Sequence, residues 1–252
     1  MRTDRAEALA AGHVSHPTAF ERSVLDLLDR VEYRRCDSGE DKEAVYRLRY
    51  KANHAHGVLG EMPEQRLSDE LDEKANCYCF GIFIDGNLVS SVRLNHLSLA
   101  MPYAPIMTIF SDMLTPRLAR GETFIDPSRL VVDPDLPVNR ALPYVTLRLA
   151  VMALTYFDCT SCVSMVREEH TGFYNRIFGS VQMGGPRPYP PFTRPLYFYE
   201  SRCEVNMEPT LARFSFFRST AFERRMLFER TQIGEIAPLT VLPTARYHRR
   251  AA

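Results

Sequence analysis

An aspartate and an arginine stand directly ahead of an apolar run in the segment FIDPSRLVVDP, residues 124–134. The apolar run is typical of a buried strand, whereas Asp126 and Arg129 bring two charges to its start. Residues three apart in a regular strand point to opposite faces. Pro127 favours a bulge or bend that would turn both charges toward one pocket. Placed together, a carboxylate can act as a general base and a guanidinium can bind a carboxylate.

Further charges occupy positions where the pattern predicts a core. Arg93 lies within the apolar strand pattern SSVRLNH, where an arginine needs an acidic partner or a ligand. Arg49 lies on a predicted helix, and Asp69 and Asp72 close a long polar loop over residues 57–71. Structural ion pairs would explain any one of these residues. Together around one cleft they would suit a zwitterionic substrate, because arginine binds a carboxylate and aspartate binds an ammonium group.

The elements that must position these residues alternate between helices and strands. Apolar spacing predicts helices over residues 20–31, 43–57, 107–121, 142–157 and 170–179. It predicts strands over residues 31–38, 76–84, 87–98, 123–134, 161–166 and 192–202, and Asp85–Gly86 is a strong hairpin signal. This order favours an α+β fold with a mixed, mostly antiparallel sheet flanked by helices.

Length and composition predict one main domain with appendages. The chain has 252 residues, of which 45% are hydrophobic. We divide it into an N-terminal lead-in and helix (1–30), a central domain (31–205) and a C-terminal helical extension (206–252). Phenylalanines and arginines alternate in that extension. They predict a helix whose aromatic face packs on the domain, with a basic amphipathic surface helix as the alternative.

Charge and hydropathy exclude several classes of function. The 31 basic and 31 acidic residues balance, so no global field favours nucleic acid or an anionic membrane. No apolar run approaches the ~20 residues of a membrane span, and the N-terminus lacks the apolar middle of a signal peptide. We therefore expect a cytoplasmic protein with no transmembrane segment and no nucleic-acid partner.

Six cysteines do not form a disulfide framework in a chain of this length. The CTSC segment, Cys159 to Cys162, has the spacing of a metal or redox site but stands alone and leads into a predicted strand. Thiols three apart in an extended chain diverge. We predict buried free thiols and no bound metal.

The order of elements resembles that of the Gcn5-related N-acetyltransferase fold. The residue pattern is similar to its autoinducer-synthase branch, which comprises acyl-homoserine-lactone synthases and N-acyl amino acid synthases. That pattern is an arginine on the first helix, an Asp-x-x-Asp loop, an Arg-Leu strand and an acid-x-Ser-Arg strand. It is matched, in order over residues 41–133, by Arg49, Asp69 to Asp72, Arg93-Leu94 and Asp126 to Arg129, and FYNRIFG extends the match to about residue 200.

The departures from this pattern favour one part of the branch. Homoserine-lactone synthases carry an aromatic residue and a tryptophan after the first-helix arginine, where this chain has Asn53, His54 and no tryptophan. The acid before Ser-Arg is aspartate rather than glutamate. Both differences favour the N-acyl amino acid synthases over enzymes that use S-adenosylmethionine. The acetyltransferase glycine-rich loop is missing, which implies an acyl carrier protein as the donor.

The resemblance implies transfer of a fatty acyl group from an acyl carrier protein, or CoA, thioester to the amine of an amino acid. The acyl-phosphopantetheine thioester would be a co-substrate, with no permanently bound cofactor. The implied catalytic residues are Asp126 as the base, Arg129, and Tyr174, which would protonate the leaving thiolate. Arg129 or Arg93 would bind the substrate carboxylate.

The remaining implied roles concern binding. Substrate binding is assigned to Arg49, Asp69, Asp72 and Arg93, with the two aspartates ordering their loop by pairing with Arg49. The acyl-donor arm would lie along Leu130, Val131 and Val132 and reach Arg140. The free N–H groups at the start of the helix after Arg140 favour a phosphate there.

Three alternatives remain open at this point. An acyl-homoserine-lactone synthase would make a quorum-sensing autoinducer and release methylthioadenosine from S-adenosylmethionine. An ornithine-type lipid acyltransferase shares a similar strand arginine. A non-catalytic relative would bind a lipid or a carrier protein without turnover.

Overall fold

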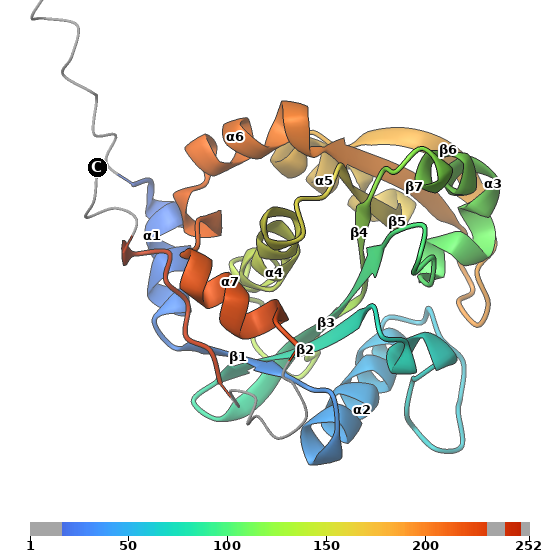
Figure 1. The fold of residues 1–252 in the computed structure, drawn as a ribbon. Coiled ribbons are helices and arrows are strands. Elements are labelled where there is room, and N and C mark those ends of the chain that lie inside the picture. The colour runs from blue at the N-terminus through green and yellow to red at the C-terminus, as the bar shows by residue number, and fades with distance from the viewer. Residues whose placement is uncertain (1–16, 231–239, 248–252) are drawn as a thin grey trace, which may run out of the picture.

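A computed structural model describes residues 17–230 and 240–247 of the chain. These residues form a seven-stranded sheet with helices on both faces (Figure 1). The predicted α+β class with a mostly antiparallel sheet is confirmed. Most of the predicted polar lead-in, residues 1–16, lies outside the described residues, as do residues 231–239 and 248–252 of the C-terminal extension.

The helices and strands begin and end as follows. They are α1 (Ala19–Leu28), β1 (Val31–Arg35), α2 (Gly39–Ala55), the 3-10 helix η2 (Glu70–Glu73), β2 (Cys77–Ile84), β3 (Asn87–Leu97), α3 (Pro105–Ala119), β4 (Phe124–Val132), α4 (Leu142–Tyr156), β5 (Ser161–Val166), η3 (Glu168–His170), α5 (Thr171–Phe178), β6 (Val181–Arg187), β7 (Leu196–Arg202), α6 (Cys203–Arg213), η4 (Ser215–Phe217) and α7 (Ala221–Phe228).

The strand order in the sheet is β1-β2-β3-β4-β5-β7-β6. Neighbouring strands pair antiparallel except β4 and β5, which run parallel because the crossover helix α4 connects them. Their pairing covers just two residue pairs, Phe124↔Ser161 and Ile125↔Cys162. Beyond these pairs the two strands are not hydrogen-bonded to each other, and the sheet opens.

The hairpin and the sheet edge show where the sequence was and was not informative. Asp85 and Gly86 both have positive φ, 51° and 79°, as the predicted two-residue hairpin turn requires. Strand β6 was missed, because its sequence VQMGGPR contains two glycines and a proline, which are rare in strands. It forms an edge strand and is largely exposed on both faces.

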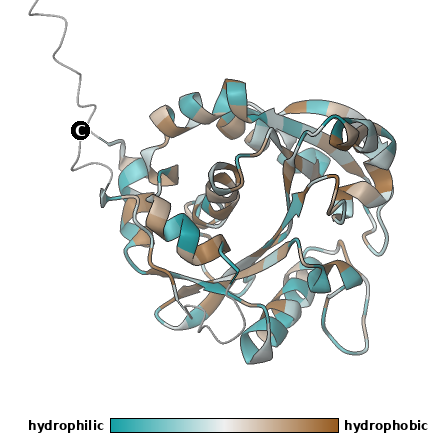
Figure 2. Ribbon diagram, viewed as in Figure 1, coloured by the Kyte–Doolittle hydropathy of each residue, from teal (hydrophilic) through white to brown (hydrophobic). Residues whose placement is uncertain are grey.

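Hydrophobic clusters cover both faces of the sheet. Helices α1, α4 and α7 pack on one face together with η4, and α2 and α3 contact β4 from the other (Figure 1). Figure 2 shows α2 coloured mostly as hydrophilic, whereas α4 carries much more hydrophobic colour. This difference follows from burial, because eleven of the residues of α4 are buried and α2 buries six.

The aromatic residues of the C-terminal extension pack mainly into this core. Phe214, Phe216, Phe217 and Phe228 are buried, whereas Phe222 is 66% exposed. The prediction of an aromatic face packed on the domain is confirmed for the four buried phenylalanines and is wrong for Phe222.

The cysteines form no disulfide. All six are free, as predicted; four are buried, whereas Cys162 and Cys203 are half-buried rather than buried. Within the described ranges, no group of three or more histidine, cysteine, aspartate or glutamate side chains could hold a metal ion. The described helices include none that is long and apolar enough to cross a membrane.

Candidate active site

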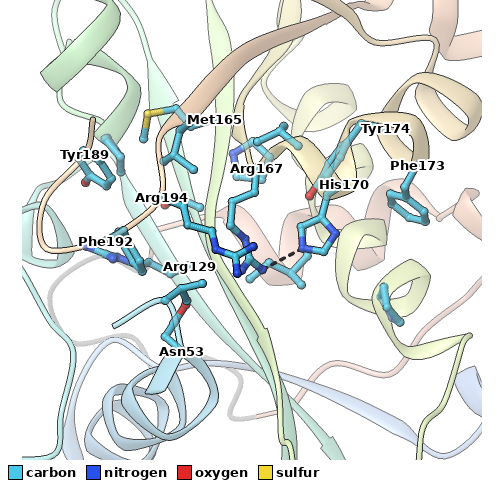
Figure 3. Close-up of a pocket in the computed structure, with 18 of the residues that line it drawn as sticks. Asn53, Arg129, Met165, Arg167, His170, Phe173, Tyr174, Tyr189, Phe192 and Arg194 are labelled. Carbon is cyan, nitrogen blue, oxygen red and sulfur yellow. Dashed lines mark hydrogen bonds between the residues drawn. The ribbon is translucent and has the colours of Figure 1, made fainter. Parts of the chain in front are cut away.

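A cavity of about 360 Å³ lies where β4 and β5 diverge. Its walls come from both strands, from the first turns of α4 and α5, from the end of α2 and from the loop between β6 and β7 (Figure 3). Sequence-distant segments meet here because two parallel strands that separate leave a gap that side chains only partly fill. Of the residues that the sequence assigned to the site, Arg129, Leu130 and Tyr174 line this cavity.

A β-bulge in β4 turns Arg129 toward this cavity. Ser128 pairs with Arg93 and Val131 pairs with Ser91, so two residues of β4 stand opposite one residue of β3. Arg129 has φ of +54°, a left-handed conformation that is uncommon for a residue with a side chain. The sequence suggested a bulge at Pro127, but that residue still pairs with Leu94. The bulge begins two residues later, at Arg129.

Three arginines from three different elements converge on two aspartates of η2. Arg49 Nη1 of α2 donates to Asp72 Oδ1 at 2.9 Å, and Arg93 Nη1 of β3 donates to Asp69 Oδ1 at 2.5 Å. Arg129 Nη2 of β4 donates to Asp69 Oδ2 at 2.7 Å. The expected pairing with Arg49 thus holds for Asp72, while Asp69 pairs with the other two arginines instead.

The two aspartates are held in place by their own backbone. Asp69 accepts a hydrogen bond from the backbone N–H of Leu71, and the Asp72 carboxylate accepts one from the N–H of Asp69. Burial alone would raise the pKa of Asp69, but Arg93 and Arg129 outweigh it and hold that pKa well below its usual range. Asp69 is therefore ionised at neutral pH.

This arginine–aspartate cluster contains three positive charges and two negative ones. Within the described part of the chain, Nε and Nη1 of Arg129 and Nη2 of Arg93 have no hydrogen-bond partner, although all three atoms are buried. A buried guanidinium that lacks partners is unfavourable. The cluster therefore has one more positive than negative charge, and Arg129 is its member that lines the cavity.

Two aromatic rings cover the guanidinium of Arg129. Its Cζ lies 4.9 Å from the centre of the Phe192 ring and 5.9 Å from that of Tyr189, both in the loop between β6 and β7. The side chain of Arg129 is 5% exposed. Burial, followed by the nearby charge of Arg93, lowers the pKa of Arg129. These contacts exclude water and strengthen the attraction of the guanidinium for an anion.

Asp126 lies behind the cavity wall rather than in it. It is fully buried, and its Oδ2 accepts a hydrogen bond from the backbone N–H of Ile106 at the start of α3, 3.1 Å away. Its Oδ1 has no partner among the described residues. Burial raises the pKa of Asp126 to about 7, against the opposing effects of that hydrogen bond and of Arg93. The neighbouring Pro127 does line the cavity.

A second, smaller cavity of about 40 Å³ shares Pro127, Leu147 and Tyr174 with the first. Its lining is largely apolar and comes from α4, α5 and the strands beside them. Tyr174 stands at the junction of the two cavities, and burial raises the pKa of its hydroxyl to about 12. The hydroxyl is therefore protonated at neutral pH and can donate a hydrogen bond.

Several residues assigned from the sequence do not line either cavity. Arg140 is exposed, Val131 packs against α2, and Val132 packs against the core on the α4 face. The cavity is instead lined by the imidazole of His170 and by two cations, Arg167 and Arg194, none of which the sequence predicted. The proline- and aromatic-rich loop PRPYPPFTRP was the available signal for the last of these, because long irregular loops in compact domains are often functional.

Comparisons with known proteins identify the family. The model of the family "N-acyl amino acid synthase FeeM" matches residues 44–202. The solved structure of FeeM, an N-acyl amino acid synthase from uncultured soil microbes, has a TM-score of 0.59 at 14% identity, covering 70% of this chain and 92% of that one. No curated protein sequence matches the chain.

Weaker structural similarities have TM-scores below 0.5. The CoA-dependent acyl-homoserine lactone synthase BjaI has a TM-score of 0.49 at 15% identity, covering 69% of this chain and 81% of that one. The AHL synthase LasI has a TM-score of 0.48 at 12% identity, covering 82% of this chain and 98% of that one.

An open parallel strand pair with a cavity between its strands, together with the family match, defines an acyltransferase with the Gcn5-related N-acetyltransferase fold. The chain belongs to the N-acyl amino acid synthase FeeM family.

Proposed function

We propose that this protein transfers a fatty acyl group from the thioester of an acyl carrier protein, or of CoA, to the amine of an amino acid. The product would be an N-acyl amino acid. The observation that carries this proposal is Arg129, which lines the cavity and belongs to a cluster with one more positive than negative charge, and whose buried Nε and Nη1 have no partner among the described residues.

The carboxylate of the amino acid supplies that missing charge. A guanidinium binds carboxylates through directed, charge-assisted hydrogen bonds, and the low polarity around Phe192 and Tyr189 makes such bonds stronger. An amine without a carboxylate would leave Nε and Nη1 of Arg129 without a partner among the described residues. The cluster thus favours a zwitterionic acceptor over a simple amine.

The second cavity, about 40 Å³, can take only the inner end of a fatty acyl chain, so the rest of the chain would lie in the main cavity. The two cavities share Pro127, Leu147 and Tyr174, so the chain would pass these three residues. Arg129 and Leu130 of the bulge line the main cavity close by. A backbone N–H group of this bulge is a candidate donor to the oxyanion that forms when the amine attacks the thioester carbonyl.

Asp126 and Tyr174 have separate roles in this reaction, as a base and as a hydrogen-bond donor. The attacking ammonium must lose a proton, and Asp126, whose pKa is about 7, is a suitable base at neutral pH if one water connects it to the amine. Tyr174 donates a hydrogen bond to the thiolate as the carbon–sulfur bond breaks. Because the pKa of its hydroxyl is about 12 and that of a thiol is about 8.5, Tyr174 keeps its proton, and the released thiolate takes a proton from water.

Mass spectrometry of extracts from cells that express the protein would name the acyl group and the amine together. Release of methylthioadenosine would instead identify an acyl-homoserine-lactone synthase. Retention of an acyl thioester without turnover would identify a non-catalytic binding protein.

The role of Arg129 is tested with the identified amino acid and its amide, which differ in the carboxylate. We expect the wild type to prefer the free acid by roughly 100-fold in kcat/KM, because a site built for a charged partner rejects an analogue that lacks it. Arg129→Met should remove most of this preference. Arg120→Met, on the exposed end of α3, is the matched control and should keep it. Equal use of acid and amide by the wild type would contradict the proposal.

A further inference from the structure

An asparagine of β3 lies directly opposite Asp126 on the face of the sheet that α2 and α3 cover. The register of β3 with β4 pairs Asn95 with Asp126, and it pairs Arg93 with Ser128 two residues further along. Residues that are directly opposite in neighbouring strands point to the same face, and so do residues two apart in one strand. Asn95 therefore stands beside Asp126 and next to Arg93 on one face.

These three side chains are buried, and their hydrogen bonds are incomplete. The residues Arg93, Asn95 and Asp126 are each 0% exposed. Among the described residues, Nδ2 and Oδ1 of Asn95, Oδ1 of Asp126 and Nη2 of Arg93 have no hydrogen-bond partner. Unpaired polar atoms inside a protein are unfavourable, and here four of them belong to neighbouring side chains.

The unpaired atoms match one another as donors and acceptors. The Nη2 group of Arg93 can donate to the amide oxygen of Asn95, and the amide nitrogen of Asn95 can donate to Oδ1 of an ionised Asp126. The Cβ atoms of directly opposite residues are about 4.5–5.5 Å apart. A rotation of the Asn95 amide or a single bridging water is enough to join polar atoms on such residues. An apolar side chain at position 95 would leave Oδ1 of Asp126 without this donor.

The other groups around Asp126 do not offer such a donor. Helix α3 contributes the backbone N–H of Ile106, which binds the other carboxylate oxygen, Oδ2. The charged and titratable side chains that face Asp126 or Asn95 come from β3, β2, β5 and the loop between β6 and β7, and they are Arg93, Cys77, Cys162 and Tyr189. Burial raises the pKa of both thiols and of the phenol, so these three groups are neutral near pH 7.

We propose that Asn95 is the positioning residue of Asp126, with its amide nitrogen bound to Oδ1 of the ionised carboxylate and its amide oxygen bound to Arg93. The role in catalysis rests on the proposed function, whereas the contact itself does not. With Ile106 on one oxygen and Asn95 on the other, the carboxylate has a fixed orientation. Each oxygen keeps a further lone pair for the water that would bring the proton from the amine.

The substitution Asn95→Leu tests this contact, because it keeps the approximate size of the side chain and removes both amide atoms. A donor favours the ionised form of a carboxylate, so its loss should raise the pKa of Asp126 by roughly one unit. The free energies of unfolding of the variant and the wild type are measured in urea from pH 5 to 9. The variant should go on losing stability above pH 7, where the curve of the wild type becomes level, so the difference between them should grow with pH.

The same substitution in the Asp126→Asn background separates positioning from packing. No carboxylate titrates at position 126 in that background, so Asn95→Leu should change the free energy of unfolding equally at every pH. Asn95→Thr keeps a hydroxyl donor and should give a smaller shift in the same direction. It takes the place of the leucine variant if Asn95→Leu does not fold.

Ser91→Ala is the matched control for these measurements. Ser91 lies on the same strand and face as Asn95, is fully buried, and has a hydroxyl without a partner among the described residues. It is four residues away from Asn95, or about 13 Å along the strand. The substitution should leave the pH dependence of stability and of activity as in the wild type.

The acyl-transfer assay gives a second readout. The midpoint of the pH–rate profile of Asn95→Leu should move upward by roughly one unit, so that kcat falls about tenfold at pH 6 and recovers at pH 9, with an unchanged KM for the amino acid. A stability difference that is constant from pH 5 to 9, or one that varies equally in the Asp126→Asn background, would overturn the inference. If the wild type turns over no acyl thioester, the proposed function fails, and the unfolding measurements still decide whether Asn95 acts on Asp126.

Discussion

The substitution Asp126→Asn should stabilise the folded protein at alkaline pH and abolish its proposed activity. In the folded protein the pKa of Asp126 is about 7, against an ordinary value of 3.8. The folded state therefore binds a proton that the unfolded state has lost between these two values. The contribution of the protonated Asp126 carboxyl group to stability is fully present below about pH 4 and is lost as the pH rises through about 7.

The size of the effect follows from the shift. The difference between 7 and 3.8 is about 3 pKa units, and at 1.36 kcal/mol per unit the ionised, buried carboxylate costs about 4 kcal/mol above pH 8. Asp126→Asn removes this cost, since the amide carries no charge and its oxygen can still accept the hydrogen bond from the N–H of Ile106. The variant should equal the wild type near pH 4 and exceed it at pH 8.

Urea unfolding between pH 4.5 and 8.5 measures this difference directly. The free energy of unfolding of the wild type should fall with pH relative to that of Asp126→Asn. Asp112→Asn, an exposed aspartate of α3 paired with Arg187, is the control and should follow the wild type. In parallel, the acyl-transfer rate of the wild type should rise through about pH 7 as the proposed base ionises, and Asp126→Asn should be inactive.

Two results would refute this reasoning. If wild type and Asp126→Asn lose stability in parallel from pH 4.5 to 8.5, the buried carboxylate does not have the raised pKa on which the argument depends. If the variant is more stable but keeps full activity, the carboxylate is buried as described and the base is another group.

Two further predictions concern the acyl cavity and the C-terminal extension. Ala150→Leu would fill part of the small cavity and should shift the preferred donor toward shorter acyl chains, measured by competition between acyl donors of different length. Glu223→Gln would leave the fully buried Arg148 without its counter-charge and should lower the free energy of unfolding by about 3–5 kcal/mol in urea titrations. As a control, Glu229→Gln removes an exposed ion pair with Arg225 and should change the free energy of unfolding by less than about 1 kcal/mol.

The sequence located the arginine–aspartate cluster because its members break local patterns. An arginine between apolar strand residues, such as Arg93, must meet an acid or a ligand wherever the strand lies. The structure supplies both Asp69 and Asp72 as partners. The long polar loop over residues 57–71 was informative because long loops in compact domains are often functional.

Other features depend on contacts that no local pattern contains. The left-handed backbone conformation of Arg129 is disfavoured by the residue's own side chain. The pairing of β3 with β4 and the contacts of the guanidinium with Asp69 and Phe192 hold it in place. Arg167 directly follows β5 and Arg194 lies in the loop before β7, so both line the cavity only because β5 and β7 pair in the sheet. The edge strand β6 is held by pairing with β7 rather than by its composition.

The unequal charges of the arginine–aspartate cluster connect stability with specificity. Adding a third aspartate would neutralise the cluster and satisfy Arg129, but it would also occupy the place of the substrate carboxylate. Within the described residues, Nε and Nη1 of Arg129 have no partner, which lowers the stability of the empty protein. Under the proposed function, an acceptor with a carboxylate would satisfy these atoms and an amine without one would not, so discrimination would rest on a group that is remote from the bond being formed. Asp126 follows the same logic, since a carboxylate that is easily satisfied would keep a low pKa and would be a weak base.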